Sequence, residues 1–105
     1  MDIRLTLQAR SDLEDIRRFT VETWGQEQWQ IYFTGLLAAF QQVTAETNSG
    51  RPRDILRPKM RSIGYQKHLI FFAPIAHAGG EIVIMRIVHG RRNFAALSYH
   101  DDLEA

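Results

Sequence analysis

The stretch Ile82-Val83-Ile84-Met85-Arg86-Ile87-Val88-His89-Gly90-Arg91-Arg92 decides the fold of this chain. Its first half is almost entirely apolar, so the run from Glu81 to His89 predicts a buried strand near the centre of a sheet. The second half turns polar, breaks at Gly90 and presents two adjacent arginines. A buried strand that delivers cations to its exposed end predicts an anion-binding surface. The apolar tail that continues to Leu97 predicts one helical turn.

Two further strands precede this one. Residues 66–75 contain the run Leu69-Ile70-Phe71-Phe72, which is apolar and too short to be an independent helix. Residues 59–64 form a shorter strand, and residues 76–80 predict a hairpin loop before the last strand. These three strands are joined by short connections, so we expect them to form an antiparallel sheet.

The start of the chain predicts a strand followed by a helix. Residues 2–7 alternate polar and apolar side chains, which is the period of a half-buried strand. From about Gln8 the apolar residues follow helical spacing instead, and this spacing continues to Trp24. Either Thr6 or Ser11 fits the N-cap position, so the first residue of the helix stays open.

A second helix is predicted from about Gln26 to Glu46, where apolar residues recur every three or four positions. Only Gly25 separates the two helices, which predicts an antiparallel helix hairpin. Residues 51–58 are expected to be irregular, because Pro52 and Pro58 oppose regular strand pairing. The order of elements therefore predicts an α+β fold, in which the hairpin covers one face of a three-stranded antiparallel sheet behind an N-terminal strand.

Length and composition fit one small domain that spans residues 1–105. The chain is 45% hydrophobic and 24% charged, which is ordinary for a globular protein. It contains no cysteine, which excludes disulfides and thiolate metal sites and favours a reducing compartment. The N-terminus lacks a signal-peptide pattern, and no apolar run approaches the roughly 18 to 20 residues of a membrane helix. We therefore expect a cytoplasmic protein with no membrane partner.

The net charge of +1 conceals an uneven distribution. Residues 1–50 hold four Lys/Arg and seven Asp/Glu, whereas residues 51–97 hold nine Lys/Arg and two Asp/Glu. The last eight residues hold three acidic side chains and no Lys or Arg. Basic residues concentrated around a sheet suggest a surface for phosphates or for an acidic protein. The alternative is that they protect strand edges from aggregation.

Common cofactor and metal motifs are missing from the sequence. The four histidines are His68, His77, His89 and His100. None forms a helical i, i+4 pair or stands beside a suitable carboxylate cluster, so we expect no metal site. There is no phosphate-binding loop, nucleophile elbow or dinucleotide fingerprint, so we expect no cofactor.

The cations near the predicted strands are Arg61, Lys67, Arg86, Arg91 and Arg92, with Tyr65, His68 and His89 close to them in sequence. Adjacent strands are expected to bring these residues to one end of the sheet. Arginine suits phosphate because its planar fork donates two parallel hydrogen bonds. RNA cleavage would also need proton-transfer groups, for which the candidates are His68, His89 and Tyr99.

An aromatic cluster is predicted at the helix hairpin, formed by Trp24, Trp29, Tyr32 and Phe33. Core packing is the role that we favour for these side chains. A groove for a partner helix is the alternative, because exposed aromatic side chains often anchor interfaces.

The chain resembles the ParE toxins of bacterial toxin–antitoxin modules, within the wider RelE/ParE superfamily. The likeness covers nearly the whole chain and lies in an ordered set of motifs. The motifs are Ala9-x-x-Asp12-Leu13-x-x-Ile16, Trp24-Gly25, Gly50-Arg51-Pro52 leading into Met60-Arg61, His68-Leu69-Ile70-Phe71-Phe72 and Arg86-Ile87-Val88-His89-Gly90-Arg91-Arg92.

This resemblance implies the same strand, helix hairpin and antiparallel sheet. It also implies a ParD-like antitoxin that neutralises the toxin in a hetero-oligomer. The expected target of ParE-like members is DNA gyrase, which is poisoned so that replication stalls and growth is arrested.

RelE-like relatives instead cleave mRNA at the ribosome with basic residues and a C-terminal tyrosine. The corresponding residues here would be Arg61, Lys67, Arg92 and Tyr99. Tyr99 is displaced from the place of that tyrosine, and Ser98 lies nearer to it. This departure, together with the ParE-like contexts of His68 and of His89-Gly90, favours gyrase as the target and a toxin that is not an enzyme. The RelE-like endoribonuclease is the alternative.

An acidic, amphipathic antitoxin segment is expected to cover the hairpin aromatics and the basic end of the sheet. The predicted partner-binding residues are Trp24, Trp29, Arg61, His68, Arg86, His89, Arg91 and Arg92. Charge reversal of Arg86 and Arg92 is expected to weaken that complex and to make it more sensitive to salt.

Overall fold

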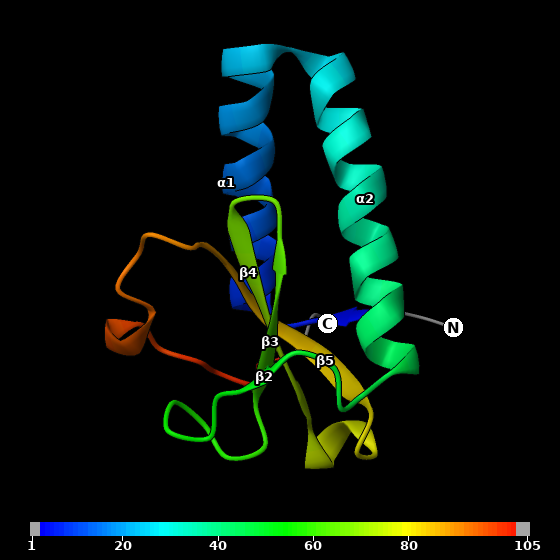
Figure 1. The fold of residues 1–105 in the computed structure, drawn as a ribbon, viewed down its shortest axis with the longest axis vertical. Helices are drawn as coiled ribbons and strands as arrows, with labels where there is room; N and C mark the ends of the chain where they lie inside the picture. The colour runs from blue at the N-terminus through cyan, green and yellow to red at the C-terminus, as the bar shows by residue number, and fades with distance from the viewer. Residues whose placement is uncertain (1–2, 103–105) are drawn as a thin grey trace.

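The computed structural model describes residues 3–102. In chain order the elements are β1 (Arg4–Leu5), α1 (Leu7–Trp24), α2 (Gln26–Ala45), β2 (Arg51–Pro52), β3 (Arg61–Tyr65), β4 (His68–Pro74), the 3-10 turn η1 (Ala76–Ala78), β5 (Ile82–His89) and the 3-10 turn η2 (Phe94–Ala96). The helices stand side by side along the long axis of the molecule, and the sheet lies against their lower half (Figure 1). In the part of the chain that the structure describes, neither helix is long and apolar enough to cross a membrane.

The five strands form one mixed sheet in the order β1-β5-β4-β3-β2. β5 lies between β1, which is parallel to it, and β4, which is antiparallel. β3 pairs with β4 and β2 with β3, both antiparallel. The predicted α+β order of strand, helix hairpin and antiparallel strands is confirmed. The sheet is larger than the predicted three strands because β1 and β2 add short edge strands to it.

The first helix begins at Leu7, within one residue of the predicted start, because Thr6 ends the strand. The Thr6 hydroxyl accepts a hydrogen bond from the backbone N–H of Ala9 (3.0 Å), which makes Thr6 rather than Ser11 the N-cap. The same hydroxyl donates to the carbonyl of Met85 in β5 (2.7 Å). Strand β1 therefore covers only Arg4–Leu5, and the predicted strand over residues 2–7 is too long at its C-terminal end.

The helix hairpin turns at Gly25, whose positive φ of 97° is available to glycine at little cost. A second glycine, Gly35, lies in the middle of α2, where glycine is normally unfavourable. A Cβ atom at this position would lie only 1.9 Å from the hydroxyl oxygen of Tyr65 in β3. That hydroxyl donates to the carbonyl of Tyr32 (3.1 Å), so Gly35 lets the sheet pack closely against α2.

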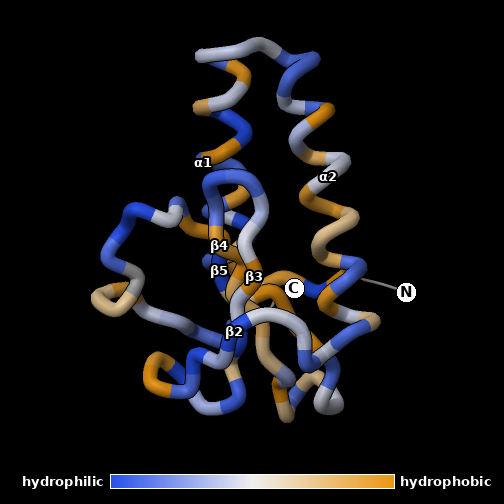
Figure 2. The backbone as a smooth tube through the Cα atoms, in the orientation of Figure 1, coloured by the Kyte–Doolittle hydropathy of each residue, from blue (hydrophilic) through white to orange (hydrophobic). Residues whose placement is uncertain are grey.

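The sheet has a hydrophobic core on each face. Against the helices, the fully buried side chains include Leu36, Phe40, Ile70, Phe72, Ile84 and Ile87. The other face buries Met60, Phe71, Val83, Met85 and Val88, with Leu56, Leu97 and Tyr99 packed against them. The β2–β3 loop and the C-terminal segment thus cover the face that the helices do not. In Figure 2, hydrophobic residues colour the central strands orange where the sheet meets the helices.

A bulge in β5 makes this two-sided arrangement possible. Phe71 pairs with Arg86 but Phe72 pairs with Ile84, which leaves Met85 as an extra residue on β5. Ile84 and Ile87 are three positions apart and would face opposite sides of a regular strand. The bulge lets both of them pack against the helices.

Strand β2 contradicts the prediction that residues 51–58 would not pair. Pro52 lies opposite Arg61, and the next residue, Arg53, donates its N–H to the carbonyl of Met60 (2.7 Å). Hydrogen-bonded and non-bonded pairs alternate along an antiparallel ladder, so Pro52 occupies a position that needs no donor. An edge strand therefore tolerates this proline.

Candidate functional site

A groove of about 710 Å³ opens between the tip of the helix hairpin and one end of the sheet. Its helical wall carries the apolar side chains of Phe19, Trp24 and Ile31, which are 64%, 70% and 62% exposed. Its sheet wall carries Lys67 from the β3–β4 turn and Arg92 from the segment after β5. The groove thus has one apolar side and one basic side.

Two histidines lie where these walls meet. His68 and His89 are cross-strand partners whose ring centroids lie 5.6 Å apart, nearly perpendicular to each other. Nδ1 of His68 is 2.5 Å from the hydroxyl oxygen of Tyr32, and Nδ1 of His89 accepts from the backbone N–H of Arg91 (3.1 Å). The second bond places the proton of neutral His89 on Nε2.

Burial shifts the pKa values of His68 and of its hydrogen-bond partner Tyr32. It lowers the pKa of His68, with a smaller contribution from the neighbouring His89 and an opposing one from Asp12. Burial also raises the pKa of Tyr32 far above its ordinary value, followed by the effect of Tyr65. Tyr32 therefore keeps its proton at neutral pH, and its hydroxyl can donate a hydrogen bond to Nδ1 of His68.

The two tryptophans of the predicted aromatic cluster have different environments. Trp29 is 7% exposed and stacks on Phe33 and Tyr32, with ring centroids 5.1 and 6.4 Å apart. Trp24, at the end of α1, is exposed on the groove. The prediction of one packed cluster is therefore correct for Trp29 and wrong for Trp24.

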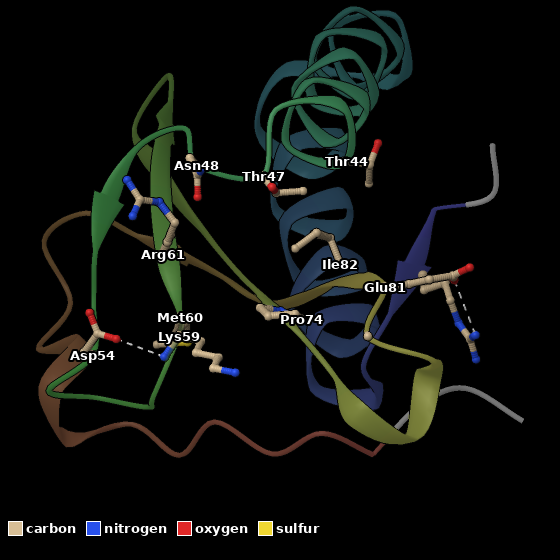
Figure 3. Close-up of a pocket in the computed structure, with 12 residues that line it drawn as sticks. Thr44, Thr47, Asn48, Asp54, Lys59, Met60, Arg61, Pro74, Glu81 and Ile82 are labelled. Carbon is tan, nitrogen blue, oxygen red and sulfur yellow. Dashed lines mark hydrogen bonds and ion pairs between the residues drawn. The ribbon is translucent and has the colours of Figure 1, made fainter.

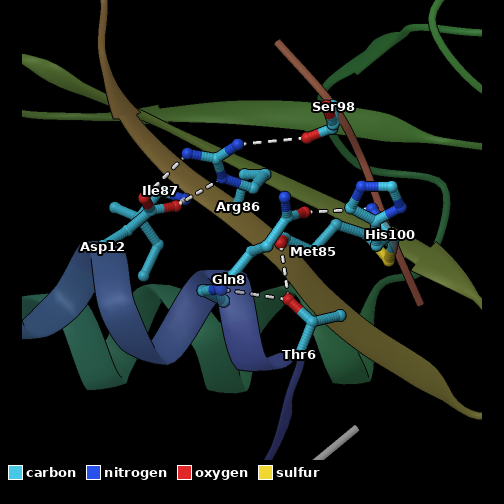
Figure 4. A network of polar contacts seen from close by, with 9 residues as sticks. Thr6, Gln8, Asp12, Met85, Arg86, Ile87, Ser98 and His100 are labelled. Atoms are coloured by element: carbon cyan, nitrogen blue, oxygen red, sulfur yellow. Dashed lines mark hydrogen bonds and ion pairs between the residues drawn. The ribbon is translucent and has the colours of Figure 1, made fainter. Parts of the chain in front are cut away.

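Arg86 does not reach the groove, because Asp12 of α1 binds its guanidinium in a two-pronged ion pair. The Nε–Oδ2 and Nη2–Oδ1 distances are 2.7 and 2.9 Å, and both side chains are 11% exposed. The third nitrogen, Nη1, donates to the carbonyl of Ser98 (3.0 Å) (Figure 4). The hydrogen bond to Asp12 raises the pKa of Arg86, which burial opposes. Arg86 thus ties together a helix, a strand and the C-terminal segment.

Asp12 also protects the exposed edge of β5. Strand β1 pairs with Val83 and Ile84, and no other strand within residues 3–102 covers the later residues of β5 on that side. The carboxylate of Asp12 accepts from the backbone N–H of Ile87 (3.0 Å). Together with the bond from Thr6 to Met85, this contact fastens α1 to the edge (Figure 4).

Arg61 lies at the other end of the sheet from the groove. It is the first residue of β3, whereas Tyr65, the last, lines the groove about 13 Å away along the strand. Its guanidinium donates to the carbonyls of Ser49 and Gly50 (2.8 and 2.9 Å). It lines a separate, more polar cavity of about 1060 Å³ beside the C-terminal end of α2 (Figure 3). The predicted gathering of Arg61 with the other cations at one end of the sheet is therefore wrong.

Tyr99 packs on the face of the sheet opposite the helices. Its ring centroid lies 5.2 Å from that of Phe71, and its carbonyl accepts from Nη1 of Arg57 (3.1 Å). Burial raises the pKa of Tyr99, opposed by the arginines Arg86, Arg53 and Arg92. The four residues of the nuclease hypothesis thus lie in different places: Lys67 and Arg92 on the groove, Tyr99 on the other face and Arg61 at the far end.

The groove brings together part of the predicted partner surface. Trp24, His68, His89 and Arg92 all line it, while Arg91 is exposed beside it in the segment after β5. Phe19 and Ile31 were not among the residues predicted to bind a partner. Both are apolar residues outside the buried stripe of their helix, and this was the only signal that marked them as surface residues. Over residues 3–102, no three His, Asp or Glu side chains are grouped to hold a metal ion.

Comparisons with known proteins agree on one family. The model of a family described as the ParE toxin of the parDE type II toxin–antitoxin system matches residues 3–94. Toxin ParE1 of Caulobacter vibrioides is 29% identical over 93 residues, which cover 89% of this chain and 93% of that protein. Toxin ParE1 of Mycobacterium tuberculosis is 30% identical over 83 residues, which cover 79% of this chain and 83% of that protein. The range matched by the family model includes every residue that lines the groove.

Proposed function

Because this chain belongs to the ParE family of toxins from type II toxin–antitoxin systems, we propose that it arrests bacterial growth by poisoning DNA gyrase in the cytoplasm. We further propose that a ParD-like antitoxin neutralises it by binding in the groove. One observation carries the second proposal: an exposed apolar wall faces a basic wall across the same groove.

The two walls complement an amphipathic, acidic segment. The apolar face of a helix would bury Phe19, Trp24 and Ile31, each of which is more than half exposed in the free toxin. Acidic side chains on the same segment would meet Lys67 and Arg92. Of the two acidic residues on the groove, Asp12 is neutralised by Arg86, so it opposes such a segment less. Asp15 forms only an exposed pair with Arg18 (3.7 Å).

The geometry supports a toxin that acts by binding. An RNA-cleaving site needs a proton acceptor and cationic groups arranged around one phosphate. Arg61 is held by two carbonyls at the far end of β3, and Tyr99 is half-buried with a raised pKa. No observation favours the RelE-like endoribonuclease over the gyrase poison.

Antitoxin binding can be tested with matched charge reversals. The antitoxin would be sought in the adjoining reading frame, as a short protein with a ribbon–helix–helix pattern and an acidic tail. We expect Lys67→Glu with Arg92→Glu to weaken its affinity roughly 10- to 100-fold, and less so at high salt. Arg51→Glu changes an exposed cation outside the groove and should leave the affinity unchanged. If Arg51→Glu lost as much antitoxin affinity as the double variant Lys67→Glu/Arg92→Glu, this placement of the antitoxin would be refuted.

The target can be tested with two purified systems. We expect the toxin to inhibit DNA supercoiling by gyrase and to increase the amount of cleaved DNA bound to it. A coupled translation reaction should continue without codon-positioned mRNA cuts. Cuts in the mRNA together with unchanged gyrase activity would replace this proposal by the endoribonuclease.

A further inference from the structure

The loop between β2 and β3, residues 53–60, displays an isoleucine that is in full contact with solvent. Ile55 is 99% exposed, more than any other large hydrophobic residue that the structure describes. Its neighbour Leu56 packs against the core on the face away from the helices, and Met60 is completely buried there. The loop is thus anchored by two apolar side chains and holds a third one outwards.

The backbone of this loop is well fixed by hydrogen bonds. Its ends are joined from Arg53 N–H to the Met60 carbonyl (2.7 Å), and Met60 N–H donates to the carbonyl of Arg57 (3.1 Å). Across the loop, the backbone N–H of Lys59 donates to the carboxylate of Asp54 (3.0 Å). Binding through Ile55 therefore requires little ordering of the loop, which favours affinity.

The loop around Ile55 is net basic: it carries Arg53, Arg57 and Lys59 against Asp54, and Arg51 precedes it in β2. We call these four cations the basic rim. The side chains of Arg51 and Lys59 are exposed and make no hydrogen bond or ion pair with another described residue. The nearby guanidiniums of Arg53 and Arg57 contact Ser62 and the C-terminal segment. Two available cations are few for a nucleic-acid backbone, where several phosphates must be neutralised. They suit an apolar pocket with an acidic rim on a protein.

The Ile55 loop and the groove lie at opposite ends of β3, because the loop leads into Arg61 and the groove is lined by Tyr65. We propose that Ile55 and its basic rim contact the protein that this toxin inhibits, on a surface separate from the antitoxin groove. This inference rests on the toxin function proposed above. It assigns the partner by its chemistry, as an acidic protein surface with a pocket for one branched aliphatic side chain.

Two substitutions of the same kind separate the surfaces. Ile55→Asp should reduce growth arrest and inhibition of the target at least tenfold, and leave antitoxin affinity within about threefold of wild type. Ile31→Asp, in the groove, should weaken antitoxin binding at least tenfold and leave growth arrest intact. Leu7→Asp changes a half-exposed leucine outside both surfaces and should alter neither property. Circular dichroism would confirm that each variant is folded, and Ile55→Val should keep most of the activity.

Three results would overturn the inference. The first is wild-type growth arrest by Ile55→Asp. The second is a loss of antitoxin affinity in Ile55→Asp that is as large as its loss of growth arrest. The third is binding of linear duplex DNA by the wild type that Ile55→Asp abolishes, because the loop would then contact nucleic acid. The growth-arrest assay does not depend on which protein the toxin inhibits. A toxin that arrests growth but leaves gyrase untouched would refute the gyrase proposal, while the Ile55 comparison still tests the loop.

Discussion

Replacing Asp12 with alanine should destabilise the fold more than any surface charge substitution. The change removes the two carboxylate oxygens that accept from Arg86, whose side chain is 11% exposed, and with them the acceptor of the Ile87 N–H. Breaking a buried ion pair from one side typically costs about 3–5 kcal/mol, because the remaining charge stays buried without its partner. Arg86 keeps its bond to the carbonyl of Ser98, so we expect about 3 kcal/mol.

The assay is urea unfolding, followed by tryptophan fluorescence and circular dichroism. The matched control is Asp15→Ala, three residues along the same helix, whose ion pair with Arg18 is 3.7 Å long and more than half exposed at both ends. That change should cost less than about 0.5 kcal/mol. Asp12→Asn keeps an oxygen for the Ile87 N–H and should fall between the two.

A double-mutant cycle gives the sharpest test of this pair. If the cost of Asp12→Ala arises from the unpaired guanidinium, Arg86→Met in the same chain should recover much of it, with a coupling energy of about 2 kcal/mol. The reasoning is refuted if Asp12→Ala is no more destabilising than Asp15→Ala. It is also refuted if the two substitutions at the pair simply add.

Two further predictions concern the packing of β3 and the histidine pair. Gly35→Ala should destabilise the protein by about 1–3 kcal/mol in urea, although alanine is the better helix former, because its Cβ would lie 1.9 Å from the Tyr65 hydroxyl. Gly64→Ala, whose Cβ meets nothing, is the control, and a stabilising Gly35→Ala would contradict the packing described here. Because burial and His89 lower the pKa of His68 below 6.5, the unfolded chain binds a proton there at higher pH than the folded chain does. Stability should therefore fall as the pH drops below about 6.5 and level off below the lowered pKa, and His68→Gln should flatten this dependence in thermal unfolding from pH 7 to pH 5. If stability depended on pH equally steeply in His68→Gln and in the wild type, the lowered pKa of His68 would not be its cause.

Local patterns in the sequence were sufficient to predict the main elements. The apolar run that ends at His89 lies at the centre of the sheet as β5, and the single Gly25 marks the hairpin turn. The predicted helical turn after the arginines is present as η2, Phe94–Ala96. These features follow from hydrophobic period and turn chemistry, which act between near neighbours in the chain.

The features that the sequence did not reveal depend on contacts between distant residues. The bulge at Met85 shifts the register of β5, so strand alternation alone misplaces Arg86. Asp12 lies 74 residues from Arg86, and no local pattern indicates that their charges cancel. Likewise, Arg61 and Lys67 are close in sequence but lie at opposite ends of β3, because the strand between them is extended. A list of cations therefore predicted a basic surface without predicting which of them share it.

The most direct test of the proposed function is the formation of cleaved gyrase–DNA complexes by the purified toxin. Supercoiled plasmid, gyrase and ATP would be incubated with increasing toxin, and linear DNA would be measured after protein digestion. We predict that linear DNA increases with toxin and returns to its basal amount when one equivalent of antitoxin is added. Unchanged linear DNA and unchanged supercoiling at toxin concentrations that arrest growth would contradict the proposal.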